Sequence, residues 1–295
     1  MLKKYVVLLI IFLGMHVSTF ADPAPQPTKK FVINNSQVIP IKSKAGRDYE
    51  LVVLLPASYY TQPAKKYPVL YYVDAYWDTP LLVSTYGNLL FDNEVPEFIM
   101  VGLSYPQGAD YDKERHLDLT FTKAGFGNST GGAFVFLDFI KQQVAPLIEK
   151  DFRGLPNDRV LSGSSLGGLF ALTAAYSADN FFSGYIAISP AVQWDDNALF
   201  KLDETYAQKN KSLNARIFTS YGTAEYAAFR DPIIQFQKQL AARKYQGLDL
   251  QNYAMEGIEH ASVKGDGYVR GLMWVWKSKK PAGPSGLERI YTEAQ

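Results

Sequence analysis

The 295-residue chain contains no cysteine and only three histidines. The absence of cysteine excludes disulfides, thiolate catalysis and cysteine-ligated metal sites. With so few histidines, a zinc site built on histidine is nearly excluded as well. The formal charge is +1, without a basic cluster or an acidic tail, so nothing indicates a nucleic-acid surface or a polyanionic partner. With 47% hydrophobic residues, a chain of this length can bury the core of one ordinary α/β domain.

The first residues have the composition of a secretory signal. Lys3 and Lys4 precede an apolar stretch that is too short and too poorly flanked for a spanning helix. Small or tolerated residues favour cleavage before Asp22, so we expect a signal peptide at 1–21 and an extended, proline-rich segment at 22–29. An uncleaved anchor is the alternative. Cleavage would leave 28 basic and 29 acidic residues, so the mature surface is expected to be close to neutral. The signal peptide predicts a periplasmic or secreted protein without stable membrane insertion.

Residues 30–295 are expected to form a single α/β domain. Two alternating stretches, Lys30–Ile41 and Tyr49–Leu55, indicate an antiparallel hairpin. Continuous apolar runs, typical of buried parallel strands, then follow at Tyr67–Val73, Glu97–Leu103, Arg159–Leu161, Gly184–Ser189, Ala215–Ser220 and Leu248–Tyr253. Helical periodicity is best at Ala133–Phe152, Gly168–Tyr176 and Pro232–Tyr245. The alternation predicts a mostly parallel, twisted sheet of about eight strands with helices on both faces.

A Gly-x-Ser-x-Gly signature separates a predicted strand from a predicted helix. In such a turn Ser165 lies on strained backbone that lifts its hydroxyl into solvent. Gly163 and Gly167 supply the missing side chains that let strand and helix approach closely. An ordinary glycine–serine turn is the alternative, but the flanking strand and helix favour a nucleophile elbow.

A serine hydroxyl needs a base within hydrogen-bond reach to become a good nucleophile at neutral pH. His16 would be removed with the signal peptide, which leaves His116 and His260. His260 directly follows the last predicted strand, where the order Ser, acid, His of the α/β-hydrolases places the base. A structural histidine is the alternative, but position and scarcity favour His260 as the base and disfavour His116.

The remaining catalytic groups are expected in two strand-to-helix loops. Glu225 follows a predicted strand and is the expected acid, although a solvated glutamate is the alternative and Asp231 lies only six residues away. An oxyanion hole needs two preorganised N–H donors. One is expected to be the amide of Leu166, after the nucleophile. The other is expected from Tyr76, with Ala75 as a close rival, in the turn after the first buried strand; an ordinary aromatic-lined loop is the alternative there.

From about Lys30 to Trp276 the chain resembles the putative esterase family of the α/β-hydrolases, which contains esterase D and the enterochelin (ferric catecholate siderophore) esterases. The matching segments are Tyr67–Ala75, Arg115–Thr120, Gly163–Gly168, Ile188–Pro190, Tyr221–Glu225 and Glu259–Ser262. The resemblance implies that Ser165 is the nucleophile, His260 the base and Glu225 the acid. It also implies a fold without a metal or organic cofactor.

Two positions depart from the family pattern. Phe121 stands where relatives commonly have proline, so the loop from Tyr105 to Gly132 is expected to take a different path. Ala75 stands where many relatives have glycine, and its methyl group is expected to lie where a substrate oxygen would approach.

The loop of almost thirty residues before Ala133 is expected to border the pocket, because it is longer than a plain connector. Arg115 in this loop could bind a substrate carboxylate or acidic catechol through its planar fork of donors; an internal pair with Asp118 or Asp112 is the alternative. Aromatic residues near the predicted mouth could stack on an aromatic group, or could simply belong to the core. They are Tyr59, Tyr60, Tyr71, Tyr72, Tyr76, Trp77 and Tyr86.

These features predict a secreted or periplasmic serine carboxylester hydrolase that acts through an acyl-enzyme. The expected partner is a small-molecule ester, of the siderophore type or with a short acyl or aromatic group. A serine peptidase or an acyltransferase would use the same machinery, and a non-catalytic binding protein is the remaining alternative. The oligomeric state is left open.

Overall fold

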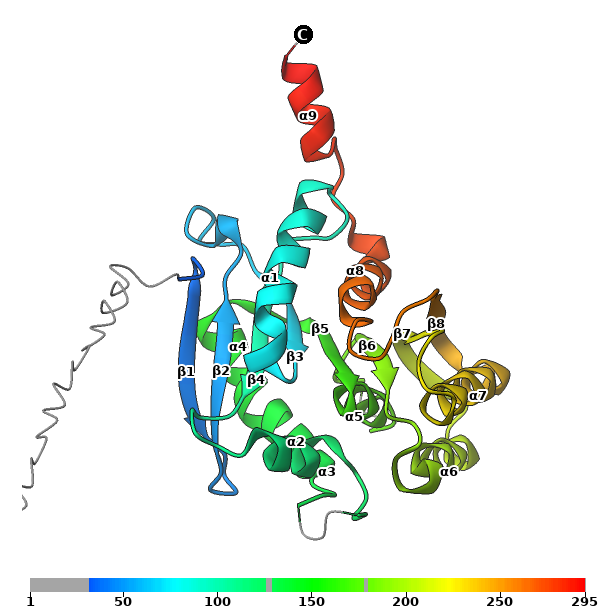
Figure 1. The fold of residues 1–295 in the computed structure, drawn as a ribbon. Helices are drawn as coiled ribbons and strands as arrows, with labels where there is room; N and C mark the ends of the chain where they lie inside the picture. Colours follow the sequence, from blue (N-terminus) through cyan, green and yellow to red (C-terminus); the bar gives the residue numbers. More distant parts are fainter. Residues whose placement is uncertain (1–31, 126–128, 178–179, 295) are drawn as a thin grey trace, which may run out of the picture. The chain divides into compact units, whose positions relative to one another are not determined.

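The computed structural model describes residues 32–125, 129–177 and 180–294. The expected signal peptide at 1–21 and proline-rich segment at 22–29 lie outside the described residues. The chain from Asn35 onward forms one compact unit, built on an eight-stranded sheet of order β1-β2-β4-β3-β5-β6-β7-β8. Figure 1 shows this sheet between layers of helices.

The sheet is antiparallel at one edge and parallel elsewhere. β1 (Ser36–Lys42) pairs with β2 (Asp48–Leu54), and β2 pairs antiparallel with β4 (Ile99–Ser104). The other pairs are all parallel. The remaining strands are β3 (Tyr67–Tyr72), β5 (Gly154–Ser165), β6 (Gly184–Pro190), β7 (Ser212–Gly222) and β8 (Gln246–Met255). The predicted fold class is confirmed, and β3, β4 and β6 are buried along their whole length, as expected for strands covered on both faces.

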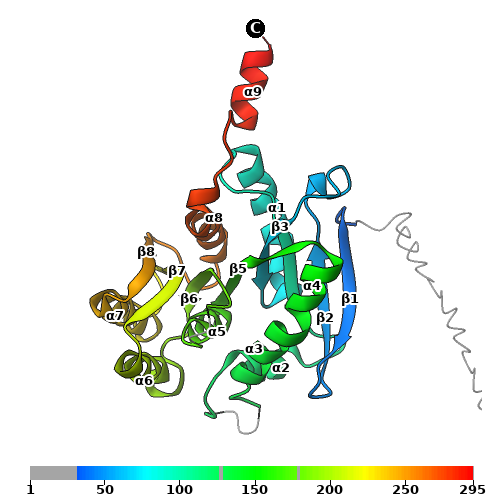
Figure 2. The same ribbon diagram turned by 180° about the vertical axis from the view of Figure 1, so that it is seen from behind.

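Two layers of helices cover the sheet. α1 (Ala75–Phe91) and α8 (Lys264–Val275) pack together on one face, whereas α4 (Ala145–Asp151) and α5 (Leu166–Ala175) pack on the other (Figures 1 and 2). α5 contacts α6 (Trp194–Lys209), which contacts α7 (Ala227–Arg243). The other helical segments are η1 (Ala57–Tyr59), α2 (Tyr111–Leu119), α3 (Ala133–Phe139), the π-helical η2 (Ile140–Val144), η3 (Lys277–Lys279) and α9 (Gly286–Glu293). Among the described residues, none of the helices combines the length and the hydrophobicity that a membrane span needs.

The sequence pattern found some helices and missed others. The helix expected at Ala133–Phe152 is present as α3, η2 and α4 in succession. α1, α2, α6 and α8 were not predicted. α1 contains Pro80, and α6 contains three consecutive left-handed residues at 195–197. Proline normally marks the end of a helix in a sequence pattern, and left-handed residues interrupt the regular right-handed helix.

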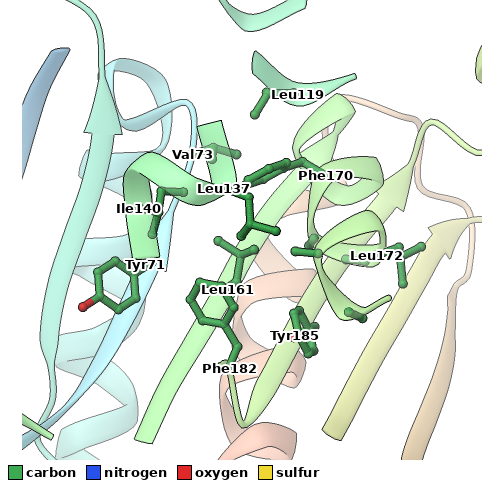
Figure 3. Close-up of a cluster of buried hydrophobic side chains, with 14 of the residues drawn as sticks. Tyr71, Val73, Leu119, Leu137, Ile140, Leu161, Phe170, Leu172, Phe182 and Tyr185 are labelled. Atoms are coloured by element: carbon green, nitrogen blue, oxygen red, sulfur yellow. The ribbon is translucent and has the colours of Figure 1, made fainter. Parts of the chain in front are cut away.

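A large cluster of buried side chains lies between the sheet and the helices from α3 to α7. Figure 3 shows Tyr71 and Leu161 of the sheet facing Leu137 of α3, Ile140 of η2 and Phe170 of α5. Every residue of α5 is buried, because this helix is apolar on all its faces. Packing therefore holds α5, the helix that directly follows Ser165, along its whole length.

Candidate active site

The expected nucleophile lies on a strained turn at the carboxyl end of β5. Ser165 is the last residue of β5 and has φ 58° and ψ −118°, a conformation that a non-glycine residue rarely adopts. The turn is possible because Gly163 and Gly167 touch: a Cβ on Gly163 would lie 2.5 Å from the carbonyl carbon of Gly167. The strand-turn-helix geometry is that of a nucleophile elbow, with Ser165 directly before α5.

The structure brings Ser165, His260 and Glu225 together from three separate loops. His260 Nε2 lies 3.2 Å from Ser165 Oγ, and His260 Nδ1 lies 3.4 Å from Glu225 Oε2. Ser165 ends β5, and the loops that carry Glu225 and His260 follow β7 and β8, so all three side chains meet at the carboxyl edge of the parallel strands. The His260 side chain is 41% exposed, and its ring packs edge-on against Phe229 at 4.4 Å. The site is therefore open to solvent on the histidine side.

The Glu225 carboxylate is fully buried and is held by several donors. Gly222 N–H donates to Oε1 at 2.8 Å, and the Ser189 hydroxyl contacts Oε1 and Oε2 at 2.8 and 2.7 Å. Burial by itself would raise the pKa of Glu225. The bonds from His260, Gly222 and Ser189 outweigh this effect and lower the pKa below its usual value. Glu225 is therefore a buried, ionised partner for an imidazolium.

The alternative acid and base lie elsewhere. Asp231 pairs with its neighbour Arg230 at 2.9 Å, and its side chain is half exposed. His116 lies on α2, where Nδ1 contacts the Asp112 carbonyl oxygen at 2.7 Å. Among the described residues, these bonds hold Asp231 and His116 to neighbours on their own helices and not to Ser165 or His260. Those residues also contain no group of three or more side chains suited to hold a metal ion.

Two helices begin where the oxyanion donors are expected. α5 begins at Leu166, and α1 begins at Ala75, so the segment expected as a loop is the first turn of a helix. The first N–H groups of a helix have no acceptor within it. The preceding residues, Ser165 and Asp74, do not cap these ends with their side chains. The amides of Leu166, Ala75 and Tyr76 therefore remain as candidate donors at positive helix ends.

The methyl group of Ala75 does not lie where the sequence analysis expected it. Ala75 is only 1% exposed, and a Cβ on Gly102 of β4 would lie 2.5 Å from the Ala75 Cβ. The methyl group therefore points inward against β4 rather than toward an approaching substrate. That expectation was wrong, because the helical start of α1 turns the Ala75 side chain toward the sheet.

Arg115 is engaged by a partner that was not foreseen. Its Nε and Nη2 donate to the two carboxylate oxygens of Asp74 at 2.9 and 2.8 Å, and its side chain is 14% exposed. Neither Asp118 nor Asp112 is the partner; Asp118 instead accepts hydrogen bonds from Arg47 and Tyr49. Asp74 immediately precedes α1, so Arg115 fixes the segment that carries the candidate oxyanion donors.

The aromatic residues near the expected mouth have different locations. Tyr71 and Tyr72 are fully buried. The Arg153 guanidinium lies over the Tyr59 ring, next to the amino end of β5 and therefore far from Ser165. Tyr59 lies at this edge of the sheet because it follows β2, which runs antiparallel to the parallel strands. Tyr60 packs against Tyr59, and the Tyr86 hydroxyl bonds to the backbone of Phe98, just before β4. Tyr76 and Trp77 lie in the first turn of α1, after the carboxyl end of β3. Trp77 is 59% exposed, and Lys264 Nζ lies 3.9 Å above its ring.

The sequence analysis missed two residues that touch the site, Asp74 and Ser189. Each stands inside a segment that carried the family resemblance: Asp74 directly follows the apolar run Tyr67–Val73, and Ser189 is the last residue of the run Gly184–Ser189. A polar residue at the carboxyl end of a buried parallel strand is the signal that could have found them.

The profile of the family described as "Putative esterase" matches residues 43–264. The chain belongs to this family. The eight-stranded sheet is that of an α/β-hydrolase, in agreement with the resemblance noted in the sequence. This putative esterase is therefore a hydrolase.

Curated relatives of this esterase-family chain include two siderophore esterases. The Ferri-bacillibactin esterase BesA of Bacillus subtilis is 26% identical over 252 residues, which cover 79% of this chain and 86% of that protein. The Siderophore triacetylfusarinine C esterase of Aspergillus fumigatus is 29% identical over 197 residues, which cover 64% and 65%. Among solved structures, the BES protein from Bacillus cereus has a TM-score of 0.76 at 26% identity and covers 85% of this chain and 99% of that one. An IroE-like serine hydrolase from Shewanella oneidensis has a TM-score of 0.75 at 25% identity and covers 84% and 82%.

Proposed function

We propose that this chain is a serine carboxylester hydrolase in which Ser165 is the nucleophile, His260 the base and Glu225 the acid. Ser165 Oγ attacks the ester carbonyl carbon while His260 Nε2 takes the hydroxyl proton. His260 then gives that proton to the departing alcohol, which leaves an acyl group on Ser165. Water, deprotonated by the same Nε2, attacks the acyl carbon and releases the acid, and Ser165 recovers its proton.

The observation that carries this proposal is the 3.2 Å contact between Ser165 Oγ and His260 Nε2 at a strained turn. Strain at a buried structural serine would have no benefit, whereas a nucleophile gains exposure and alignment from it. The amides of Leu166 and Tyr76, with Ala75 as the rival of Tyr76, would hold the oxyanion that forms on the carbonyl oxygen. Glu225 would stabilise the imidazolium that forms at the same moment.

The substrate class that we propose is a siderophore-type ester. Two relatives carry names that state such substrates, and one of them matches 86% of its own length. An open site agrees with a bulky ester, because the His260 and Trp77 side chains are both largely accessible to solvent. Short acyl and aromatic esters are the comparison substrates in the test.

The location that we propose is the periplasm or the external medium, on the basis of the charged and apolar pattern of residues 1–21. N-terminal sequencing of the protein from the cell envelope and medium should begin at Asp22. A protein that starts at Met1 and stays with the membrane would contradict cleavage.

The activity is tested by steady-state kinetics of the purified chain on four esters: a tricatecholate triester siderophore, triacetylfusarinine C, methyl ferulate and p-nitrophenyl acetate. We expect one of the two siderophores to have the highest kcat/KM. We also expect Ser165→Ala to lower kcat by at least about 10³-fold on every ester. Product analysis with added alcohol or peptide acceptors separates hydrolysis from acyl transfer and peptide cleavage. Turnover by Ser165→Ala near the wild-type rate would overturn the mechanism.

A further inference from the structure

Ser189 occupies an irregular position at the end of β6. The pairing of β5 with β6 shifts register there, since Ser164 faces Ile188 but Ser165 faces Pro190. Ser189 is the residue left between the two pairs, and it has φ 42°. Such an irregularity redirects a side chain that a regular strand would send elsewhere. Left-handed backbone at a residue other than glycine is costly, and it persists where the surrounding structure enforces it.

The redirected hydroxyl lies between the acid and the base. Ser189 is fully buried, and its Oγ lies 2.7 and 2.8 Å from the Glu225 carboxylate oxygens and 3.1 Å from His260 Nδ1. The direct contact between His260 Nδ1 and Glu225 is longer, at 3.4 Å. N–H···O bonds are normally 2.7–3.2 Å long. The path through Ser189 therefore has the better hydrogen-bond distances.

The protons of the three groups fit this path without conflict. A hydroxyl has one proton to donate and two lone pairs with which to accept. The ionised Glu225 carboxylate only accepts hydrogen bonds, so the Ser189 hydroxyl donates its proton to Glu225. A lone pair of Ser189 Oγ then accepts the Nδ1 proton of neutral His260. This tautomer leaves the lone pair on Nε2, which is the nitrogen that faces Ser165 Oγ.

We propose that Ser189 is a positioning residue of the catalytic site: its hydroxyl bridges Glu225 to His260 Nδ1 and so fixes the tautomer and orientation of the imidazole. This inference rests on the proposed function. Ser189 does not touch the reacting atoms, and it acts through His260. When Nε2 takes the Ser165 proton, the same bridge holds the imidazolium while Glu225 balances its charge. No bond to Ser189 forms or breaks in this role.

The test compares Ser189→Ala and Ser189→Gly with a matched control. Ala retains the Cβ at φ 42°, whereas Gly adopts this backbone without strain; both remove the hydroxyl. The control is Ser220→Ala, because Ser220 lies on neighbouring β7 and its Oγ is buried without a hydrogen-bond partner among the described residues. Hydrogen bonds to charged groups support an expected loss in kcat of about 10- to 100-fold for both Ser189 variants, with KM changed by less than about 2-fold. Ser220→Ala should retain the wild-type kcat.

Thermal unfolding and the NMR spectrum of ¹⁵N-histidine-labelled protein complete the experiment. In both Ser189 variants the His260 Nδ1–H signal should move upfield and exchange faster with water, while the unfolding transition stays cooperative. Wild-type kcat and an unchanged Nδ1–H signal in either folded variant would overturn the bridge. A kcat loss in Ser189→Ala that Ser189→Gly restores would assign the effect to backbone strain and would also overturn it. If Ser165→Ala remains active, the proposed function fails instead, so the two failures are distinguishable.

Discussion

Arg115 and Asp74 form a two-pronged ion pair that joins α2 to the start of α1. The four atoms meet in two parallel bonds of 2.9 and 2.8 Å. Because Arg115 occupies the Asp74 carboxylate, Asp74 does not cap α1 with its side chain. The pair thus fixes the start of α1 and keeps the Asp74 carboxylate away from the Ala75 and Tyr76 amides, the candidate oxyanion donors.

The ion pair predicts the effect of Arg115→Lys. Lysine keeps the charge but cannot form two parallel bonds, and a poorly paired buried carboxylate is costly. We expect the free energy of unfolding to fall by about 1–3 kcal/mol, measured by urea denaturation. We also expect kcat to fall by about 10-fold or more for all esters, because the oxyanion donors lose their support.

Arg230→Lys is the matched control, since Arg230 pairs with a half-exposed Asp231; surface pairs contribute about 0–1 kcal/mol. Kinetics on an anionic and a neutral ester separate the two roles of Arg115. A rise in KM confined to the anionic ester would show that Arg115 binds substrate and does not merely support the loop.

The inward methyl group of Ala75 predicts a loss of stability, without a large loss of activity at Ala75, for substitutions at two facing positions. Gly102→Ala should lower the free energy of unfolding by about 1–3 kcal/mol, because the new Cβ would lie 2.5 Å from both Ala75 Cβ and Tyr72 Cζ. Ala75→Gly should cost about 1 kcal/mol and leave kcat within about 3-fold. Urea denaturation and steady-state kinetics measure both. A large rise in kcat for Ala75→Gly would mean that the methyl group does obstruct the substrate.

The two histidines described should differ sharply in their contribution to catalysis. His260→Ala removes the base and should lower kcat by about 10³-fold or more. His116→Ala should leave kcat within about 3-fold, because His116 bonds to its own helix on α2. Equal losses at His116 and His260 would contradict the assignment of the base.

Glu225→Gln should lower kcat by about 10²–10⁴-fold and less than Ser165→Ala does, since it changes the partner of the imidazolium but keeps the nucleophile and base.

The lowered pKa of Glu225 also predicts a pH dependence of stability. An acid whose pKa is lower in the folded protein stabilises it above the unfolded pKa, which is ordinarily 4.5. This contribution is lost as the pH falls from that value through the folded pKa. Glu225→Gln should therefore show a shallower fall in unfolding free energy below pH 4.5 than the wild type, measured by urea denaturation at a series of pH values. An identical slope in both proteins would contradict a lowered pKa.

The sequence predicted those parts of the molecule that short segments encode. The apolar runs located the six parallel strands, and Gly163 to Gly167 predicted the sharp turn at Ser165, because a strand, a turn and a helix are each local patterns. The start of α1 was misread because the pattern at Asp74 to Trp77 is that of a turn, and Pro80 obscures the helix behind it. α8 was not predicted either; it contains Gly265, Gly267 and Gly271, and glycine disfavours a helix.

Long-range pairings could not be predicted in the same way. Arg115 and Asp74 are 41 residues apart, and Ser189 and His260 are 71 apart. Carboxylates at Asp112 and Asp118 are nearer to Arg115 in sequence and are equally plausible as partners by charge. Asp74 becomes the partner only because the tertiary fold brings α2 close to the residue before α1. The role of Ser189 depends on a register shift between β5 and β6, which no residue pattern of β6 alone indicates.

The central claim is that Ser165 is an activated nucleophile, and covalent labelling tests it most directly. Purified protein is treated with a fluorophosphonate and its intact mass is measured beside that of Ser165→Ala. The mechanism predicts a single adduct on the wild type, loss of the adduct in Ser165→Ala, and slower labelling in His260→Ala. A folded wild-type protein that takes up no label, or a Ser165→Ala variant that is labelled as fast as the wild type, would contradict it.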